Sequence, residues 1–102
     1  MKTIQFKQYS CVIEKNEYRN GGPALHLLCA EDGEPIATAT VWLPNIPAGC
    51  VAIKNYSGNE GMLPALVSAG VVSKPINYIS SGFVTIPVCK LNEDKLIDFL
   101  IP

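Results

Sequence analysis

The chain is short of charge. Only 17% of its 102 residues are charged, against about 25% in an average domain. Arg19 is the only arginine and the net charge is −1, so no basic stripe is present that could neutralise phosphates, and we expect no direct binding of nucleic acid. A weakly charged surface on a small domain favours a partner-binding face or a homo-oligomer, because large exposed apolar patches are rare on monomers.

Residues suited to metal binding and catalysis are also few. His26 is the only histidine, and none of the four cysteines (Cys11, Cys29, Cys50 and Cys89) belongs to a C-x-x-C pair, which argues against a zinc centre. His26 and Cys29 point to opposite faces of a predicted strand, so they do not form a nucleophile–base pair. No pair of carboxylates is recognisable as an acid and a base. We therefore predict no metal, no cofactor and no enzymatic activity.

Long apolar runs are absent from the sequence. No stretch approaches the roughly 20 residues that cross a membrane, so we expect no membrane partner. The chain alternates from Met1 to Phe6, unlike the apolar core of a signal peptide. We therefore expect a cytoplasmic protein with reduced thiols.

The length predicts one domain, residues 1–102, with one hydrophobic core. Apolar residues alternate or cluster in several short segments, which predicts strands at 3–9, 11–13, 24–30, 35–43, 50–53 and 83–91. Helical spacing predicts one helix that starts at Asn59 or Glu60 and ends before Gly70, and another that follows Asn92. The order indicates an α+β fold: an antiparallel sheet of four to six strands, one helix packed on a face, and a short C-terminal helix.

Two details of the predicted sheet can be tested directly. Asp32-Gly33 is a strong turn signal, so 24–30 and 35–43 should form a hairpin. Pro87 interrupts the segment 83–91. Because proline cannot donate a ladder hydrogen bond, this segment should be an edge strand or should turn the N–H side of Pro87 outward.

The first candidate binding region is a polar loop between two apolar elements, and such loops on rigid scaffolds often carry binding residues. Its candidate residues are Lys54, Asn55, Tyr56, Ser57, Asn59 and Glu60. The loop leads into a helix N-terminus, whose N–H groups favour an anion. Ser57 and Asn59 are equally suited to be ordinary helix caps. Both interpretations stay open.

The second candidate region combines polar and aromatic side chains. Tyr18, Arg19 and Asn20 precede two glycines, and a guanidinium beside an aromatic ring suits stacking on a base or anchoring in an interface. Trp42, the only tryptophan, lies at the end of a predicted strand, where it is either a core residue or an interface anchor.

Two long segments carry a resemblance to a known family. Residues 30–41 (AEDGEPIATATV) and 53–63 (IKNYSGNEGML) resemble a small domain-of-unknown-function family carried by bacteriophages and bacterial mobile elements. The likeness spans about Tyr18 to Cys89, and the chain departs from it at Gly58 and Pro64, at the start of the predicted helix. The family contributes no catalytic motif. The resemblance implies a phage accessory protein that acts inside a bacterial cell.

In that context we expect a non-enzymatic accessory protein that antagonises a bacterial immune (defence) system by binding a host defence protein. Its expected interface includes the Tyr18–Asn20 loop, Trp42 and the Lys54–Glu60 loop. An interface of standard size needs about 800 Å² per partner, which a domain of this length can provide. The alternative is an oligomeric sponge that sequesters a nucleotide-type immune signal between subunits. In the sponge, Arg19, Tyr56 and helix N-terminal amides would hold base and phosphate. A structural component of the virion is a third possibility.

Overall fold

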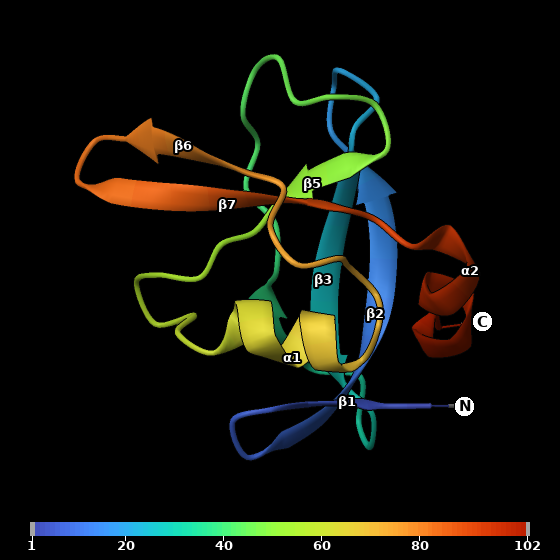
Figure 1. Ribbon diagram of the computed structural model, residues 1–102. Helices are drawn as coiled ribbons and strands as arrows, with labels where there is room; N and C mark the ends of the chain where they lie inside the picture. Colours follow the sequence, from blue (N-terminus) through green and yellow to red (C-terminus); the bar gives the residue numbers. More distant parts are fainter. Residues whose placement is uncertain (1, 102) are drawn as a thin grey trace.

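The computed structural model describes residues 2–101, which form two antiparallel sheets and two short helices (Figure 1). The first sheet has the strand order β1-β2-β3-β4, with β1 Ile4–Phe6, β2 Tyr9–Glu17, β3 Pro23–Cys29 and β4 Pro35–Thr38. The second has the order β5-β7-β6, with β5 Cys50–Ala52, β6 Asn77–Ser81 and β7 Val84–Lys90. The helices are α1 Met62–Ser68 and α2 Glu93–Leu96, and α2 continues into the 3₁₀ turn η1 Ile97–Phe99.

The α+β class is confirmed, but the expected single sheet is replaced by two. The predicted hairpin exists as β3 and β4, with Leu27 opposite Ala37 and an irregularity after Leu27. β4 ends at Thr38 because the next residues turn to the second sheet, where Thr40 pairs with Ile53. The Thr40 hydroxyl accepts a hydrogen bond from the Leu25 N–H at 3.2 Å. A side-chain oxygen therefore bonds β3 beyond the last backbone pair between β3 and β4.

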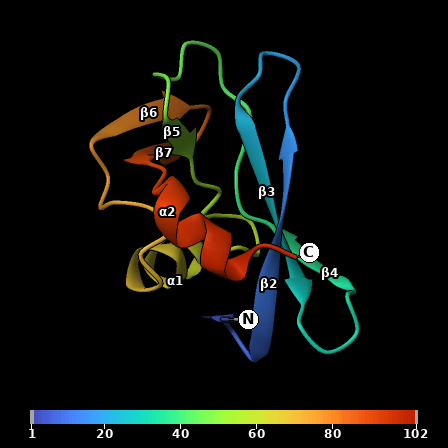
Figure 2. The ribbon, with the colours of Figure 1, turned by 90° about the vertical axis from the view of Figure 1, so that its right-hand side faces the viewer.

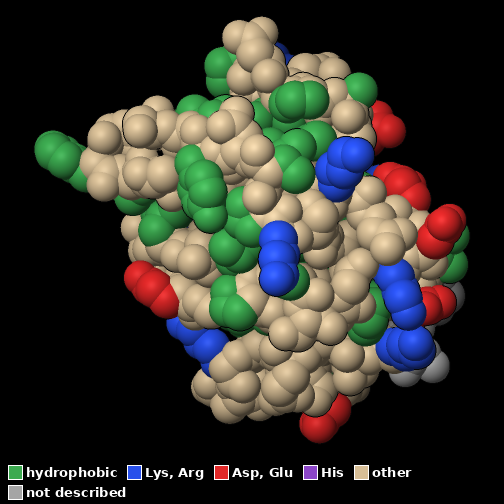
Figure 3. Space-filling view, in the orientation of Figure 1, with side chains coloured by type: hydrophobic (Ala, Val, Ile, Leu, Met, Phe, Trp, Pro, Cys, Tyr) green, Lys and Arg blue, Asp and Glu red, His purple; other side chains and the backbone are tan. Residues whose placement is uncertain are grey.

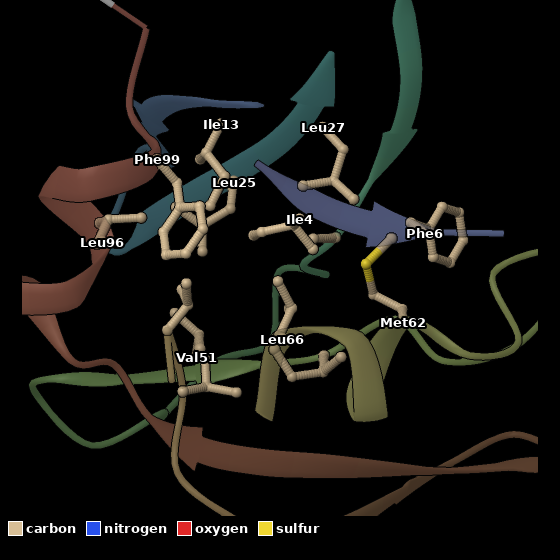
Figure 4. Packing of buried hydrophobic residues seen from close by; sticks show 14 of the residues in the cluster. Ile4, Phe6, Ile13, Leu25, Leu27, Val51, Met62, Leu66, Leu96 and Phe99 are labelled. Atoms are coloured by element: carbon tan, nitrogen blue, oxygen red, sulfur yellow. The ribbon is translucent and has the colours of Figure 1, made fainter. Parts of the chain in front are cut away.

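The core lies between the two sheets. Figure 2 shows the second sheet and both helices on the same side of β2 and β3. In Figure 4, Leu25 from β3, Val51 from β5 and Leu66 from α1 point toward a common interior, and all three belong to one buried cluster. Packing that combines both sheets joins them into a single hydrophobic core.

Helix α1 starts later than predicted. Gly61, with φ of +96°, is the residue before its first turn, and Pro64 is the third helical residue, a position where the missing N–H costs little. The predicted ending is confirmed: Gly70 has φ of +78°, and the N–H of Val71 donates to the Leu66 carbonyl at 3.1 Å. This is a Schellman motif, which requires a left-handed residue after the helix.

The last helix begins as predicted, after Asn92, and one of its large apolar residues is exposed. The Asn92 side chain accepts the Lys95 N–H at 3.3 Å. Leu96 and Phe99 are buried, whereas Ile97 is 66% exposed. Ile97 lies outside the packed face because the 3₁₀ turn changes the helical spacing there. Neither helix in the described part of the chain has the length and apolar character needed to cross a bilayer.

The β6–β7 hairpin projects from the body of the molecule as an arm (Figure 1). Residues 77–81 lie outside the predicted strands but form β6. β7 is the central strand of its sheet, so of the two alternatives expected from Pro87 the edge strand is wrong. The Pro87 carbonyl accepts the Ile53 N–H at 2.9 Å. The ring nitrogen of Pro87 therefore faces the same side, just beyond the last residue of β5.

Candidate binding groove

The turn between β2 and β3 meets the chain after β4 at one surface hollow. It has a volume of about 510 Å³ and is lined by Tyr18, Arg19, Asn20 and Trp42. We call it the Trp42 groove. These are the four residues of the second candidate region, and the fold brings Trp42 to the other three across more than twenty positions of sequence. Trp42 is 48% exposed there.

Backbone hydrogen bonds fix the shape of the turn. The Tyr18 N–H donates to the Gly22 carbonyl and the Gly21 N–H to the Tyr18 carbonyl, both at 2.8 Å. Asn20 adds a side-chain bond, because its Oδ1 accepts the Gly22 N–H at 3.0 Å. Gly21 has φ of +87°, a conformation that glycine adopts without strain. The Trp42 groove therefore has one rigid wall.

Tyr18 is anchored to the junction between the sheets. Its hydroxyl lies 2.9 Å from the Oγ1 of Thr40, which is only 2% exposed. Because Thr40 also bonds Leu25 of β3, the Tyr18 ring is held by the sheet and loses little freedom when a ligand contacts it. Sequence reasoning missed Thr40, whose only signal is a hydroxyl among the small apolar residues of the segment 37–41.

Arg19 supplies the charge of the groove. Its side chain is exposed, and it forms no salt bridge with any residue between 2 and 101. A guanidinium in this state can bond a carboxylate in a bidentate fashion or stack on an aromatic ring.

A second hollow adjoins the turn. It has a volume of about 340 Å³ and is formed by the residues of two loops, 20–23 and 46–50. Asn20 belongs to both hollows. Figure 1 shows the two loops at the same end of the molecule, so a partner that fills the Trp42 groove would also reach this second hollow.

The other candidate region, the loop Lys54–Glu60, lies apart: none of its residues lines the Trp42 groove. Asn59 is 8% exposed, and its Nδ2 donates to the carbonyls of Thr38 at 2.7 Å and Lys54 at 3.0 Å. Glu60 accepts the Gly58 N–H at 3.0 Å. These side chains hold the loop in its own conformation.

The first turn of α1, residues 62–64, offers no free N–H group to a phosphate. The Met62 N–H donates to the Asn59 carbonyl at 3.0 Å, and the Leu63 N–H donates to the Asn55 side chain at 2.8 Å. Pro64 has no N–H. Anion binding at a helix N-terminus requires unsatisfied amides, so the first turn of α1 does not provide such a site.

The remaining residues of the loop are accessible. The Lys54 ammonium lies 6.0 Å from the centre of the Tyr56 ring, within the range of a cation–π contact. Both side chains are half-buried, and Ser57 is exposed with φ of +51°. They form a small surface of their own beside α1.

Two of the four thiols have a raised pKa. Burial, and secondarily the neighbouring Cys29, raises the pKa of Cys11. Burial, and secondarily Cys50, raises the pKa of Cys89 to about 11, whereas nucleophilic thiols need a lowered pKa. The His26 Nδ1 lies 3.1 Å from the Thr38 hydroxyl. Among residues 2–101, no group of three or more His, Cys, Asp or Glu side chains is placed to hold a metal ion.

The geometry therefore describes a groove with two aromatic walls and one cation. Comparison with known proteins adds no family to this description: no family model, no curated protein and no solved structure matches the chain.

Proposed function

We propose that the protein is a non-enzymatic accessory protein of a bacteriophage or mobile element. It antagonises a bacterial immune system by binding a host defence protein in the cytoplasm of the host. The observation that carries the binding role is the Trp42 groove. The phage context comes from the family resemblance of residues 30–41 and 53–63.

The side chains of the Trp42 groove are those that dominate protein interfaces. Trp, Tyr and Arg are the residue types enriched among interface hot spots, and the groove combines one of each. Tyr18 is held by Thr40, and Trp42 is half exposed. A rigid aromatic surface binds at low entropic cost because few side-chain rotamers have to be fixed.

The partner's chemistry follows from these side chains. An apolar or aromatic side chain of the partner would fill the space between Tyr18 and Trp42. A carboxylate or a carbonyl beside it would meet Arg19, which forms no salt bridge with any described residue. We therefore propose a protein segment with an apolar anchor next to an acidic residue.

The nucleotide sponge is less well supported. It depends on helix N-terminal amides, which are bonded within the chain, and on Arg19 acting together with Tyr56. Tyr56 does not line the groove that contains Arg19. We therefore favour a protein partner over a nucleotide.

The test measures how well a phage forms plaques on bacteria that each carry one defence system, with and without this protein. The wild-type protein should restore plating on at least one system, and Trp42→Ala and Arg19→Ala should each reduce that rescue at equal protein level. Ile97→Ala is the matched control, because it removes an exposed apolar side chain from the far C-terminal turn. It should rescue as well as the wild type.

Two results would contradict the proposal at different levels. Full rescue by both groove variants would remove the Trp42 groove as the docking site. A wild-type protein that relieves no defence system, or that carries a bound nucleotide in native mass spectrometry, would remove the proposed function itself.

A further inference from the structure

The arm formed by β6 and β7 has an open backbone edge. In the order β5-β7-β6, β6 is the outermost strand. The outer side of β5 is covered, because the Val41 N–H donates to the Ala52 carbonyl at 3.0 Å. No described residue outside the arm bonds the backbone of β6. Figure 1 shows the arm standing away from both helices.

The register identifies which backbone groups face outward. Tyr78 lies opposite Pro87, and Ser80 lies opposite Thr85. Because the Pro87 carbonyl faces the β5 side, Tyr78 and Ser80 direct their N–H and C=O groups away from β7. The Tyr78 N–H is taken by Asn77 Oδ1 at 2.9 Å. The Ser80 N–H and both carbonyls remain available.

This edge lacks the usual protection against strand pairing. Natural edge strands are commonly shielded by charged side chains, proline, bulges or covering loops. From Pro75 to Cys89 the sequence has no charged residue, and β6 itself contains no proline. The nearest charges, Lys74 and Lys90, lie at the base of the arm.

The arm also exposes large apolar side chains. Phe83 at the tip is fully exposed, Tyr78 is 58% exposed, and Ile76 before β6 is 53% exposed. Figure 3 shows an apolar side chain projecting into solvent from the tip of the arm. Exposed apolar groups gathered on one projecting element mark an interaction surface.

We propose that β6 pairs antiparallel with β6 of a second copy of this chain. The dimer has two-fold symmetry and joins three strands from each copy into one continuous sheet. This inference is independent of the proposed function, because it uses neither the Trp42 groove nor the phage context.

A second copy fits this edge for two reasons. Identical strands that meet about a two-fold axis place like residues near one another, and the uncharged arm avoids the repulsion that any Lys or Glu would cause. With Ile79 on the axis, Tyr78 of one copy faces Ser80 of the other, so the outward N–H and C=O groups meet. The same register brings the Phe83 tip beside the exposed Ile76 of the second copy.

The first test is the mass in solution, measured by light scattering over a dilution series. The wild type should have twice the monomer mass of 11.0 kDa and dissociate on dilution. Ser80→Pro should lose the dimer, because it removes the outward N–H without removing a bond to β7. Thr85→Pro is the matched control: Thr85 lies opposite Ser80, and its N–H faces the other side of the arm, beyond the last pair with β5. This variant should remain a dimer.

Amide hydrogen exchange of the wild type gives a second readout, which does not depend on a variant that folds. Exchange at Ser80 should slow as protein concentration rises, while exchange at Thr85 should not change. A monomeric mass at every concentration, a dimer that persists in Ser80→Pro, or a concentration-independent exchange rate at Ser80 would each overturn the proposal.

Discussion

Asn59 shows how a single polar side chain can hold distant segments together. Its amide group bonds the carbonyl of Thr38, where β4 ends, and the carbonyl of Lys54, where the polar loop begins. Both bonds are formed by a side chain that is 8% exposed. A buried donor with two partners contributes more than a surface cap would. Asn59 therefore stabilises the bend between β4 and the loop.

Replacing Asn59 with alanine should lower the free energy of unfolding by about 1–3 kcal/mol, because two buried hydrogen bonds are lost. Urea unfolding measures this change. Ser57→Ala is the control, since Ser57 is exposed and its side chain bonds none of the described residues; it should change stability by less than about 0.5 kcal/mol. Equal effects of the two substitutions would contradict the structural role given to Asn59.

Cys89 links stability to alkaline pH. Burial raises its pKa from 9.0 to about 11 in the folded protein, so the unfolded chain loses this proton first as pH rises. The free energy of unfolding therefore falls as pH rises from 9 to 11. Below pH 9 the thiol is protonated in both states, so this loss of stability is absent.

Thermal unfolding at a series of pH values tests this linkage. The melting temperature of the wild type should fall between pH 9 and pH 11. Other groups titrate in the same range, so the informative quantity is the difference from Cys89→Ala, which should have a lower melting temperature at neutral pH but a shallower decline. Parallel pH curves for the two proteins would show that the Cys89 thiol is not the responsible group.

The end of α1 depends on one glycine. Gly70 takes φ of +78°, and a Cβ at this position would lie 3.6 Å from its nearest neighbour, a side-chain carbon of Lys95, which is an ordinary contact. The requirement for glycine is therefore conformational and not steric.

Gly70→Ala should destabilise the protein by about 1–2 kcal/mol, the cost of a left-handed conformation in a residue with a Cβ. Gly70→Asn should cost less, because asparagine tolerates this conformation better. Chemical unfolding of both variants measures the order. If Asn destabilises as much as Ala, the side chain at position 70 clashes, and the account based on φ is wrong.

The elements that the sequence predicts well are those determined locally. The Asn92 cap, the Gly70 ending and the Asp32-Gly33 hairpin each depend on residues within a few positions, and each is present. The division into two sheets is not local, because it arises where the chain leaves β4 and Thr40 pairs with Ile53. The position of Pro87 in a central strand has the same cause: β5 stops before the proline ring.

The candidate site shows the same division. Residue types alone predict Tyr18, Arg19 and Asn20 as candidate binding residues, because an aromatic ring and a lone arginine beside glycines favour binding. Their meeting with Trp42 depends on the path of the chain after β4, which no short-range pattern contains. Asn55 and Asn59 likewise form hydrogen bonds with residues outside the loop Lys54–Glu60, Leu63 and Thr38 respectively.

At the scale of the whole molecule, two sheets share one interior. The buried cluster includes Ile13 and Leu27 from the first sheet, Val51 and Cys89 from the second, and Leu66 from α1. The radius of gyration is 12.6 Å, close to the value of about 13 Å for a compact chain of 100 residues. Neither sheet has a separate core, so neither should be stable without the other.

We therefore expect the monomer to unfold in one cooperative transition. Fluorescence of Trp42, beside the first sheet's turn, and far-UV circular dichroism of the whole chain should report the same midpoint. Leu66→Ala should shift both probes together by about 2–5 kcal/mol, because it leaves a cavity in the shared core. Ile97→Ala, at a side chain that is 66% exposed, should leave both nearly unchanged. If Leu66→Ala separated the two midpoints, the sheets would be independent folding units, and the Trp42 groove would belong to only one of them.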